Sequence, residues 1–192
     1  MDLLNFIIQK DKELLIFLNN LGSETFDFFW ITVTNKRTWI PLYLLLLYLI
    51  FKAFGTKKGL IVFLICCVAI TFADQFTNLI KNIFERIRPC NDLSMYEQLR
   101  ILHKSRDFSF FSGHASNSFA NTTFLFLLLR KYYKYMGLLF IWPLLFAYSR
   151  IYVGVHYPLD IFVGMIFGLL SGFIFYKISM KILNSIDLKH NI

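Results

Sequence analysis

Long apolar blocks, separated by short segments rich in charge, make up most of the chain. About 20 apolar residues, each rising 1.5 Å along an α-helix, cross the roughly 30 Å of hydrocarbon in a bilayer. Five blocks are long enough, together with their flanks, to predict membrane-spanning helices. They are Trp39–Phe54, Leu60–Phe84, Ala115–Leu129, Met136–Val153 and Leu159–Ile178. The pattern therefore predicts an all-α fold, a polytopic membrane helical bundle of five transmembrane helices.

The N-terminal segment, residues 1–35, has a broken apolar pattern. Apolar patches at residues 14–18 and 26–33 are separated by asparagine, glycine, serine and acidic side chains. This interruption favours two short helices in the membrane surface over a sixth crossing, which remains the alternative. We expect residues 1–192 to form a single domain, in which a core of about residues 60–170 carries the chemistry.

Composition and charge indicate a membrane protein. Apolar types make up 57% of the chain and charged types 17%, whereas a soluble domain has about 45–50% and about 25%. Most of the net charge of +8 lies in two loops and the tail, at residues 52–58, 130–134 and 177–189. Such basic segments face the cytoplasm. The connections around residues 85–114 and 149–160 should then face outward, and we expect membrane lipids, not nucleic acid, as partners.

Three polar clusters stand at the predicted outer ends of spans. They are K-x6-RP from Lys81 to Pro89, SGH at residues 112–114, and SR-x5-H-x3-D from Ser149 to Asp160. Because neighbouring helices run in alternating directions, these ends meet at one membrane face. The sequence therefore predicts one site built from segments that are far apart along the chain.

The basic members of these clusters predict an anion site. Lys81, Arg88 and Arg150 beside hydrocarbon would each cost about 2.5–3.5 kcal/mol if unpaired near mid-membrane. Phosphate suits them, because it carries about two negative charges and accepts bidentate bonds from arginine. Ser112 and Gly113, at the start of a predicted helix, would add backbone N–H groups and the positive end of the helix dipole.

The remaining members predict phosphoryl transfer. Pro158 favours a helix start, which brings His156 and Asp160, four residues apart, to one side. An aspartate bonded to one imidazole nitrogen fixes the tautomer and leaves the other nitrogen as a nucleophile, and His114 could protonate the leaving oxygen. A metal pair is the alternative, but a clear third ligand is missing and the cations would repel a metal. We therefore expect neither metal nor cofactor.

Taken together, the three clusters resemble, in order, the motifs of the type-2 phosphatidic acid phosphatase (PAP2) family over roughly residues 60–170. The resemblance implies that Lys81, Arg88 and Arg150 hold phosphate and that Ser112 and Gly113 complete its cradle. It also implies His156 as the nucleophile that forms a phosphohistidine, His114 as the acid and Asp160 as the partner of His156. This chain has Phe111 where the family usually has proline.

A site at the ends of apolar helices suits a lipid phosphate, whose chain stays in the bilayer. We expect undecaprenyl pyrophosphate first and lipid A phosphates close behind, with phosphatidylglycerophosphate and phosphatidate as further alternatives. The outer-loop residues Arg100, Lys104 and Arg106 could hold a second phosphate or simply face water. The small size resembles bacterial members of the family, and predicts an inner-membrane protein with its site facing the periplasm.

Two other classes of protein are open alternatives. An anion or lipid transporter would need a site open to both faces, yet the three clusters all map to one. A catalytically idle lipid-binding protein would have lost His156, His114 or Asp160, and all three are present. Asp74, inside a predicted span, should bond a neighbouring helix, Asn78 or water. The sequence makes no prediction of oligomeric state.

Overall fold

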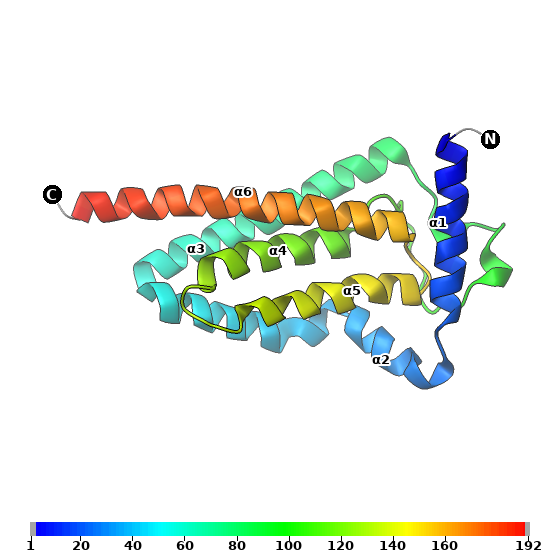
Figure 1. Ribbon diagram of the computed structural model, residues 1–192, viewed down its shortest axis with the longest axis horizontal. Coiled ribbons are helices and arrows are strands. Elements are labelled where there is room, and N and C mark those ends of the chain that lie inside the picture. Colours follow the sequence, from blue (N-terminus) through cyan, green and yellow to red (C-terminus); the bar gives the residue numbers. More distant parts are fainter. Residues whose placement is uncertain (1–2, 191–192) are drawn as a thin grey trace.

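A computed structural model describes the backbone of residues 3–190 and the side chains through Asp187, and this part of the chain contains helices and loops but no strand. Six α-helices follow in order (Figure 1). They are α1 (Leu3–Asn20), α2 (Glu24–Thr34), α3 (Ile40–Phe84), α4 (Gly113–Leu129), α5 (Ile141–Tyr152) and α6 (Pro158–His190). Short 3-10 helices include η1 (Lys36–Trp39) and η4 (Met136–Phe140), which precede α3 and α5. The predicted all-α fold is confirmed.

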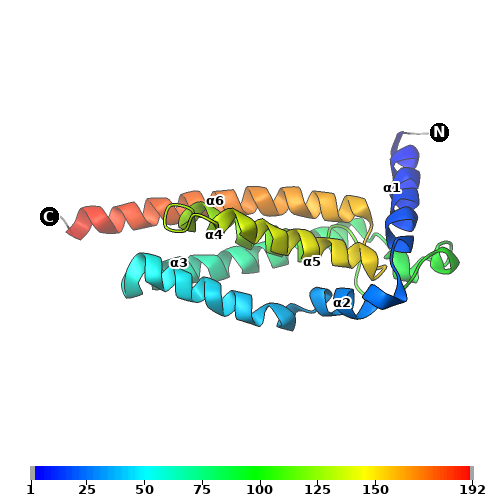
Figure 2. The same cartoon turned by 60° about the horizontal axis from the view of Figure 1, so that its bottom comes forward.

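Helix α3 is a hairpin of two arms, because the chain turns back at Gly55 (Figure 2). Gly55 has a φ of +70° and a ψ of 180°, a conformation that residues with a Cβ atom disfavour. Residues 40–54 and 56–84 form the arms, and Phe51 lies against Gly59 across the turn. The apolar blocks predicted at Trp39–Phe54 and Leu60–Phe84 correspond to these two arms.

Helix α4 lies at the centre of the bundle and packs most extensively on α6. Gly164, Gly168 and Gly172 form a stripe along α6, and a Cβ atom on any of them would lie within 2.8 Å of a backbone oxygen of α4 or of its N-cap residue Ser112. Small residues four apart let two helix backbones come close together, as in membrane helix pairs. The stripe therefore holds the start of α6 against the start of α4.

The N-terminal segment forms two helices, as predicted. Helix α1 lies across one end of the bundle, nearly perpendicular to the long helices in both views (Figures 1 and 2). Helix α2 packs on α5 instead. Leu15 of α1 is fully buried against Leu99, Ile151 and Tyr157. The segment thus closes the end of the bundle at which the chain leaves α5 and enters α6.

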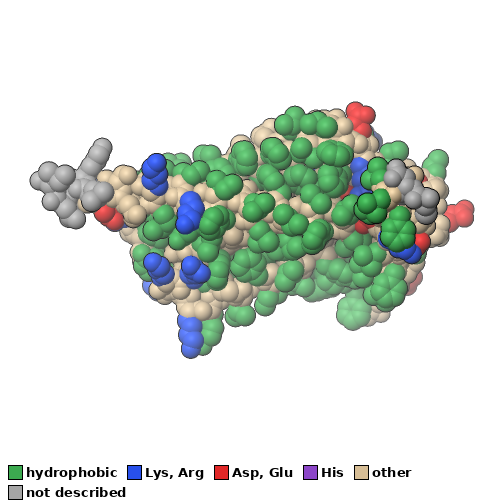
Figure 3. Space-filling view, turned by 45° about the horizontal axis from the view of Figure 1, so that its top comes forward, with side chains coloured by type: hydrophobic (Ala, Val, Ile, Leu, Met, Phe, Trp, Pro, Cys, Tyr) green, Lys and Arg blue, Asp and Glu red, His purple; other side chains and the backbone are tan. Residues whose placement is uncertain are grey.

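The outer surface of the long helices is strongly apolar. Large side chains such as Leu44, Leu64, Phe72, Leu170 and Ile174 are exposed. In Figure 3 the apolar side chains form a broad belt, with basic side chains gathered at the end of the molecule near the C-terminus. A soluble monomer rarely exposes so large an apolar surface.

Membrane-crossing length is a stricter criterion than apolarity. Within the described residues, two helical segments are long and apolar enough to cross a bilayer, Lys36–Phe84 and Pro158–Asp187, and Met136–Tyr152 is a shorter apolar helix. The first of these contains both arms of α3. The expected five crossings, or six, therefore stay a prediction. Helix α6 continues well past Ile178, where the sequence analysis ended its span.

Candidate active site

His156 and Asp160 form a buried pair where α5 gives way to α6. His156 lies in the short connection after α5, and Asp160 lies in the first turn of α6. The imidazole Nδ1 is 3.2 Å from Asp160 Oδ2, and the two side chains are 1% and 0% exposed. The backbone N–H of Tyr157 and the hydroxyl of Ser109 also donate to Asp160 Oδ2. These contacts set the orientation of the carboxylate behind the imidazole.

The opposite nitrogen of His156 faces Arg88. Arg88 Nη1 lies 2.9 Å from His156 Nε2, and since a guanidinium can only donate, Nε2 must accept. The imidazole proton therefore resides on Nδ1, toward Asp160. Burial, reinforced by the charges of Arg88 and Arg150, lowers the pKa of His156 well below its usual range. The structure thus holds His156 neutral, with a lone pair on Nε2.

Two predicted cations share one carboxylate, that of Asp107. Lys81 Nζ lies 2.5 Å and Arg88 Nη2 2.8 Å from Asp107 Oδ2. Although burial alone would raise the pKa of Asp107, hydrogen bonds from Lys81 and Ser105 and the charge of Arg88 lower it. A carboxylate oxygen of Asp107 therefore occupies the place between Lys81 and Arg88 that is predicted to hold phosphate.

Arg150, the third predicted cation, approaches from α5. Its Nη1 donates to Thr34 Oγ1 at 2.6 Å, and its Nε is buried with no hydrogen-bond partner among the described residues. A buried, unpartnered donor on a charged group is costly. Arg150 therefore has hydrogen-bonding capacity left for an anion.

The start of α4 supplies the remaining predicted residues. Ser112 caps the helix, because its hydroxyl accepts from the N–H of Ala115, while its own N–H donates to the carbonyl of Asp160. Gly113 and His114 line the same cavity as His156. The His114 ring packs against the Phe146 ring, with the two ring centres 4.7 Å apart. Ser112 thus ties α4 to α6 and is not among the residues that line the cavity.

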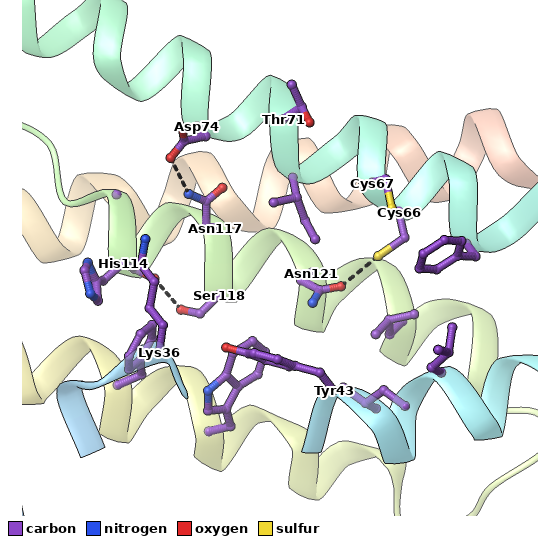
Figure 4. A pocket seen from close by; sticks show the side chains of 18 of the residues that line it. Lys36, Tyr43, Cys66, Cys67, Thr71, Asp74, His114, Asn117, Ser118 and Asn121 are labelled. Atoms are coloured by element: carbon purple, nitrogen blue, oxygen red, sulfur yellow. Dashed lines mark hydrogen bonds between the residues drawn. The ribbon is translucent and has the colours of Figure 1, made fainter. Parts of the chain in front are cut away.

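A cavity of about 610 Å³ gathers these groups, and a larger apolar groove of about 660 Å³ adjoins it. Lys36, Asp74, Gly113, His114 and Asn117 line both, which makes the two continuous. The cavity also contains Lys81, Arg88, Arg150 and His156. The groove runs between the arms of α3, α4 and α5, past Tyr43, Cys66, Thr71 and Asn121 (Figure 4).

Other sequence expectations have mixed outcomes. Asp74 accepts from Asn117 of α4 and from Asn78, which confirms the expected bonding. Arg100 pairs with Asp27 and does not line the cavity. Within the described residues, no three histidine, cysteine or acidic side chains are grouped to hold a metal.

Sequence reasoning missed four polar residues around the site. Asp107 and Ser109, from outside the motifs, and Arg86, at an unassigned position inside K-x6-RP, contact predicted site residues. Asp11 in turn contacts Arg86. Arg86 had one usable signal, a second arginine two positions before Arg88. Asp11 had none, because 75 positions separate it from Arg86 along the chain.

Comparison with solved structures identifies the same arrangement of helices elsewhere. A transmembrane PAP2-type phosphatidylglycerolphosphate phosphatase from Bacillus subtilis superposes with a TM-score of 0.72, over 93% of this chain and 88% of that one, at 23% identity. LpxE of Aquifex aeolicus superposes with a TM-score of 0.66, over 86% of this chain and 93% of that one, at 26% identity.

Curated relatives are lipid phosphatases. A lipid A 4'-phosphatase of Bacteroides thetaiotaomicron is 34% identical over 94% of this chain and 81% of its own length. A lipid A 4'-phosphatase of Porphyromonas gingivalis is 28% identical over 91% and 75%. An undecaprenyl-diphosphatase of Sulfolobus acidocaldarius is 32% identical over 81% of this chain and 64% of its own length.

A family model for the PAP2 superfamily matches residues 60–183, which include all three motifs. The curated relatives are phosphatases of lipid A and of undecaprenyl diphosphate, and a solved PAP2-type phosphatase shares this helical bundle. The chain is therefore a membrane phosphatase that belongs to the PAP2 superfamily.

Proposed function

We propose that the protein removes a phosphate group from a membrane glycolipid of the lipid A type, through a phosphohistidine on His156. The observation that carries the proposal is the alignment of Asp160, His156 and Arg88. Asp160 holds the Nδ1 proton, and the Nε2 lone pair accepts from Arg88, which lines the same cavity as His156; Arg88 must turn its N–H to the phosphate before Nε2 can attack. A neutral imidazole directed at a bound phosphate is the nucleophile that this reaction requires.

The bound phosphate takes the place of the Asp107 carboxylate between Lys81 and Arg88. The Asp107 side chain is 55% exposed, whereas that of Arg88 is 3% exposed, so the carboxylate is the partner free to move away. Arg150 adds its spare donors from α5, and Gly113 adds the positive end of the α4 dipole. Fixed donors of this kind stabilise the charge that develops on the phosphoryl oxygens.

Two chemical steps complete the reaction. In the first, the lone pair of Nε2 forms a bond to phosphorus, the bond from phosphorus to the lipid oxygen breaks, and His114 protonates that oxygen. In the second, His114 takes a proton from water as the water attacks phosphorus, and the phosphorus–nitrogen bond breaks. Asp160 stabilises the positive charge on the imidazole throughout.

The lipid part of the substrate occupies the apolar groove beside the cavity. His114 and Asn117 line both the groove and the cavity, so a phosphorylated head group and its acyl chain can be bound together. A lipid A substrate is favoured over undecaprenyl pyrophosphate because the two lipid A 4'-phosphatases match more of the chain, and more of their own length, than the undecaprenyl-diphosphatase does. Hydrolysis of undecaprenyl pyrophosphate is the second candidate, supported by that third relative.

The arrangement in the membrane is part of the proposal. Residues 40–54 and 56–84, α4, η4 with α5, and α6 cross the bilayer, and α1 lies in its outer surface. The basic loops then lie in the cytoplasm of a bacterial inner membrane, and the cavity with His156 faces the periplasm.

The test is a screen of phosphate release from purified protein in detergent, in the presence of a chelator. Lipid A, undecaprenyl pyrophosphate, phosphatidylglycerophosphate and phosphatidate are the substrates. We expect the highest kcat/KM with lipid A, and a loss of at least about a thousandfold for His156→Ala. Near-normal turnover by that variant would reject His156 as nucleophile, and a clear preference for undecaprenyl pyrophosphate would select the second candidate. Loss of activity with chelator, restored by zinc, would overturn the metal-free steps.

A further inference from the structure

Behind the His156–Asp160 pair lies a second, largely buried layer of charge. It consists of Arg86, at an unassigned position of K-x6-RP, and Asp11 of α1. Asp160 uses Oδ2 for His156, Ser109 and the N–H of Tyr157, which leaves Oδ1. Arg86 Nη1 donates to Oδ1 at 2.7 Å. The guanidinium also lies over the Tyr157 ring, 3.8 Å from its centre. Arg86 is thereby held on a rigid aromatic surface while it binds the carboxylate.

The other half of the Arg86 guanidinium is bound by Asp11 of α1. Arg86 Nη2 donates to Asp11 Oδ2 at 2.7 Å, and the Asp11 side chain is only 5% exposed. The second oxygen of Asp11 accepts from the backbone N–H of Leu159 at 2.8 Å. Leu159 lies in the first turn of α6, whose N–H groups have no partner within the helix. Asp11 thus caps, from another helix, the turn that carries Asp160.

The charges of this layer affect the stability of a positive charge on the His156 imidazole. Arg86 alone would cancel the negative charge of Asp160, which the imidazole needs when it becomes positive on phosphorylation. Burial disfavours the ionised form of both carboxyl groups and raises the pKa of Asp11, whereas Arg86 favours the ionised form by its charge and hydrogen bonds. When both are ionised, Asp11 returns the charge, because one guanidinium between two carboxylates leaves the cluster with a net negative charge. The two carboxylates are nearly excluded from water and Arg86 is partly buried, so the charge is less screened than it would be in solution.

We propose that Asp11 and Arg86 are positioning residues for the phosphoryl-transfer step, and that they make helix α1 part of the catalytic unit. Arg86 orients Asp160, and Asp11 both holds Arg86 and keeps the cluster negative. The proposal rests on the proposed function, because it concerns the rate at which His156 is phosphorylated. Neither residue touches the cavity, so neither should alter the binding of the lipid.

The central experiment compares Asp11→Asn with Glu13→Gln in purified protein. Glu13 is a matched control on the same helix, with an exposed carboxylate that pairs with Lys10. Asparagine keeps an oxygen for the Leu159 N–H but removes the charge. We expect Asp11→Asn to lower kcat about tenfold or more with KM changed less than about twofold, and Glu13→Gln to change neither. An unchanged kcat in Asp11→Asn, or a loss confined to KM, would overturn the proposal.

Loosened docking of α1 is the competing explanation, and a second variant separates it. Leu15→Ala removes fully buried packing of α1 without touching the ion cluster. Assayed as folded, monodisperse protein, it should melt at a lower temperature but keep its kcat. A kcat loss equal to that of Asp11→Asn would show that docking alone matters, and would overturn the proposal.

Coupling between the two residues gives a readout that is independent of the size of either effect. If Asp11 acts through Arg86, Asp11→Asn should cost little more in an Arg86→Met background, whereas independent roles would multiply. Arg86→Lys, which retains the charge, should recover part of the activity that Arg86→Met loses. Fully multiplicative losses would overturn the proposal. Wild-type protein that releases no phosphate from any lipid phosphate would instead reject the proposed function.

Discussion

The chemistry of the site is decided at the scale of single atoms on His156. A histidine in water titrates near pH 6.5, but here burial and the charges of Arg88 and Arg150 lower its pKa. Lys81 acts in the same direction, and Asp107 opposes it. A lowered pKa means that the folded protein resists protonation of His156 where the unfolded chain would accept it. Stability therefore falls as the pH drops below about 6.5, while His156, the proposed nucleophile, stays neutral.

This assignment predicts an NMR titration. Protein labelled with 15N-histidine should give one pair of imidazole resonances that disappears in His156→Ala. We expect those resonances to keep the shifts of a neutral ring, protonated on Nδ1, from pH 8 to below about pH 6.5. His103, which is exposed and lines the cavity, serves as an internal comparison. Protonation of His156 at or above pH 6.5, or a proton on Nε2 at neutral pH, would contradict the assignment.

At the scale of helices, the α4–α6 contact decides whether the site is assembled. Helix α4 begins at Gly113 and carries His114, whereas α6 carries Asp160, and the hydrogen bond from Ser112 to the carbonyl of Asp160 joins the two starts. The glycine stripe on α6 allows that distance. A bulkier side chain in the stripe would push His114, the proposed acid, away from His156, the proposed nucleophile.

Gly168→Ala tests this contact. A Cβ atom at Gly168 would lie 2.6 Å from the backbone oxygen of Ser116 and 2.7 Å from Phe119 Cβ. The helices must therefore separate, at a cost of about 1–3 kcal/mol, and we expect a lower melting temperature together with a lower kcat. Gly137→Ala is the control, since the nearest atom to its Cβ would be 4.0 Å away, in Phe126. Equal stability of the two variants would show that the stripe does not determine the packing.

At the scale of the whole molecule, charge divides the bundle into two ends. The turns around residues 52–58 and 130–134 are basic, and the opposite end contains the cavity and the pairs of Asp11, Asp27 and Asp107 with arginine or lysine. The apolar belt lies between them (Figure 3). Positive charge on one side of a membrane sets the orientation of such a bundle.

The proposed orientation predicts a labelling pattern in intact bacterial cells or spheroplasts. Lys104→Cys, exposed in the loop near the cavity, should react with a membrane-impermeant maleimide added outside. Lys131→Cys, exposed in the basic turn, should react only after the membrane is opened. Labelling above that of the parent protein is the measure, because three native cysteines are free. The reverse pattern would place the cavity in the cytoplasm.

The sequence by itself determined the all-α fold and the family, and it supplied the proposed reactive groups. Apolar length set the boundaries of the α3 arms and of α4 to within a few residues, because burial in hydrocarbon requires backbone bonds inside each segment. The spacing of Lys81, Arg88, His156 and Asp160 identified the family and its chemistry, because the chemistry restricts which side chains can stand there. The ranking of undecaprenyl pyrophosphate above lipid A did not rest on these motifs, because they contain no signal for the head group of the lipid.

Only the tertiary structure decided what surrounds those groups. Asp107 on the two cations, the close approach of α6 to α4, and the chain from Asp11 through Arg86 to Asp160 all join segments far apart in sequence. No periodicity or spacing encodes such contacts, because they depend on how whole helices dock and on which side chains then share a dry interior. The motifs specify the reacting atoms, and the folded bundle specifies their charge and orientation.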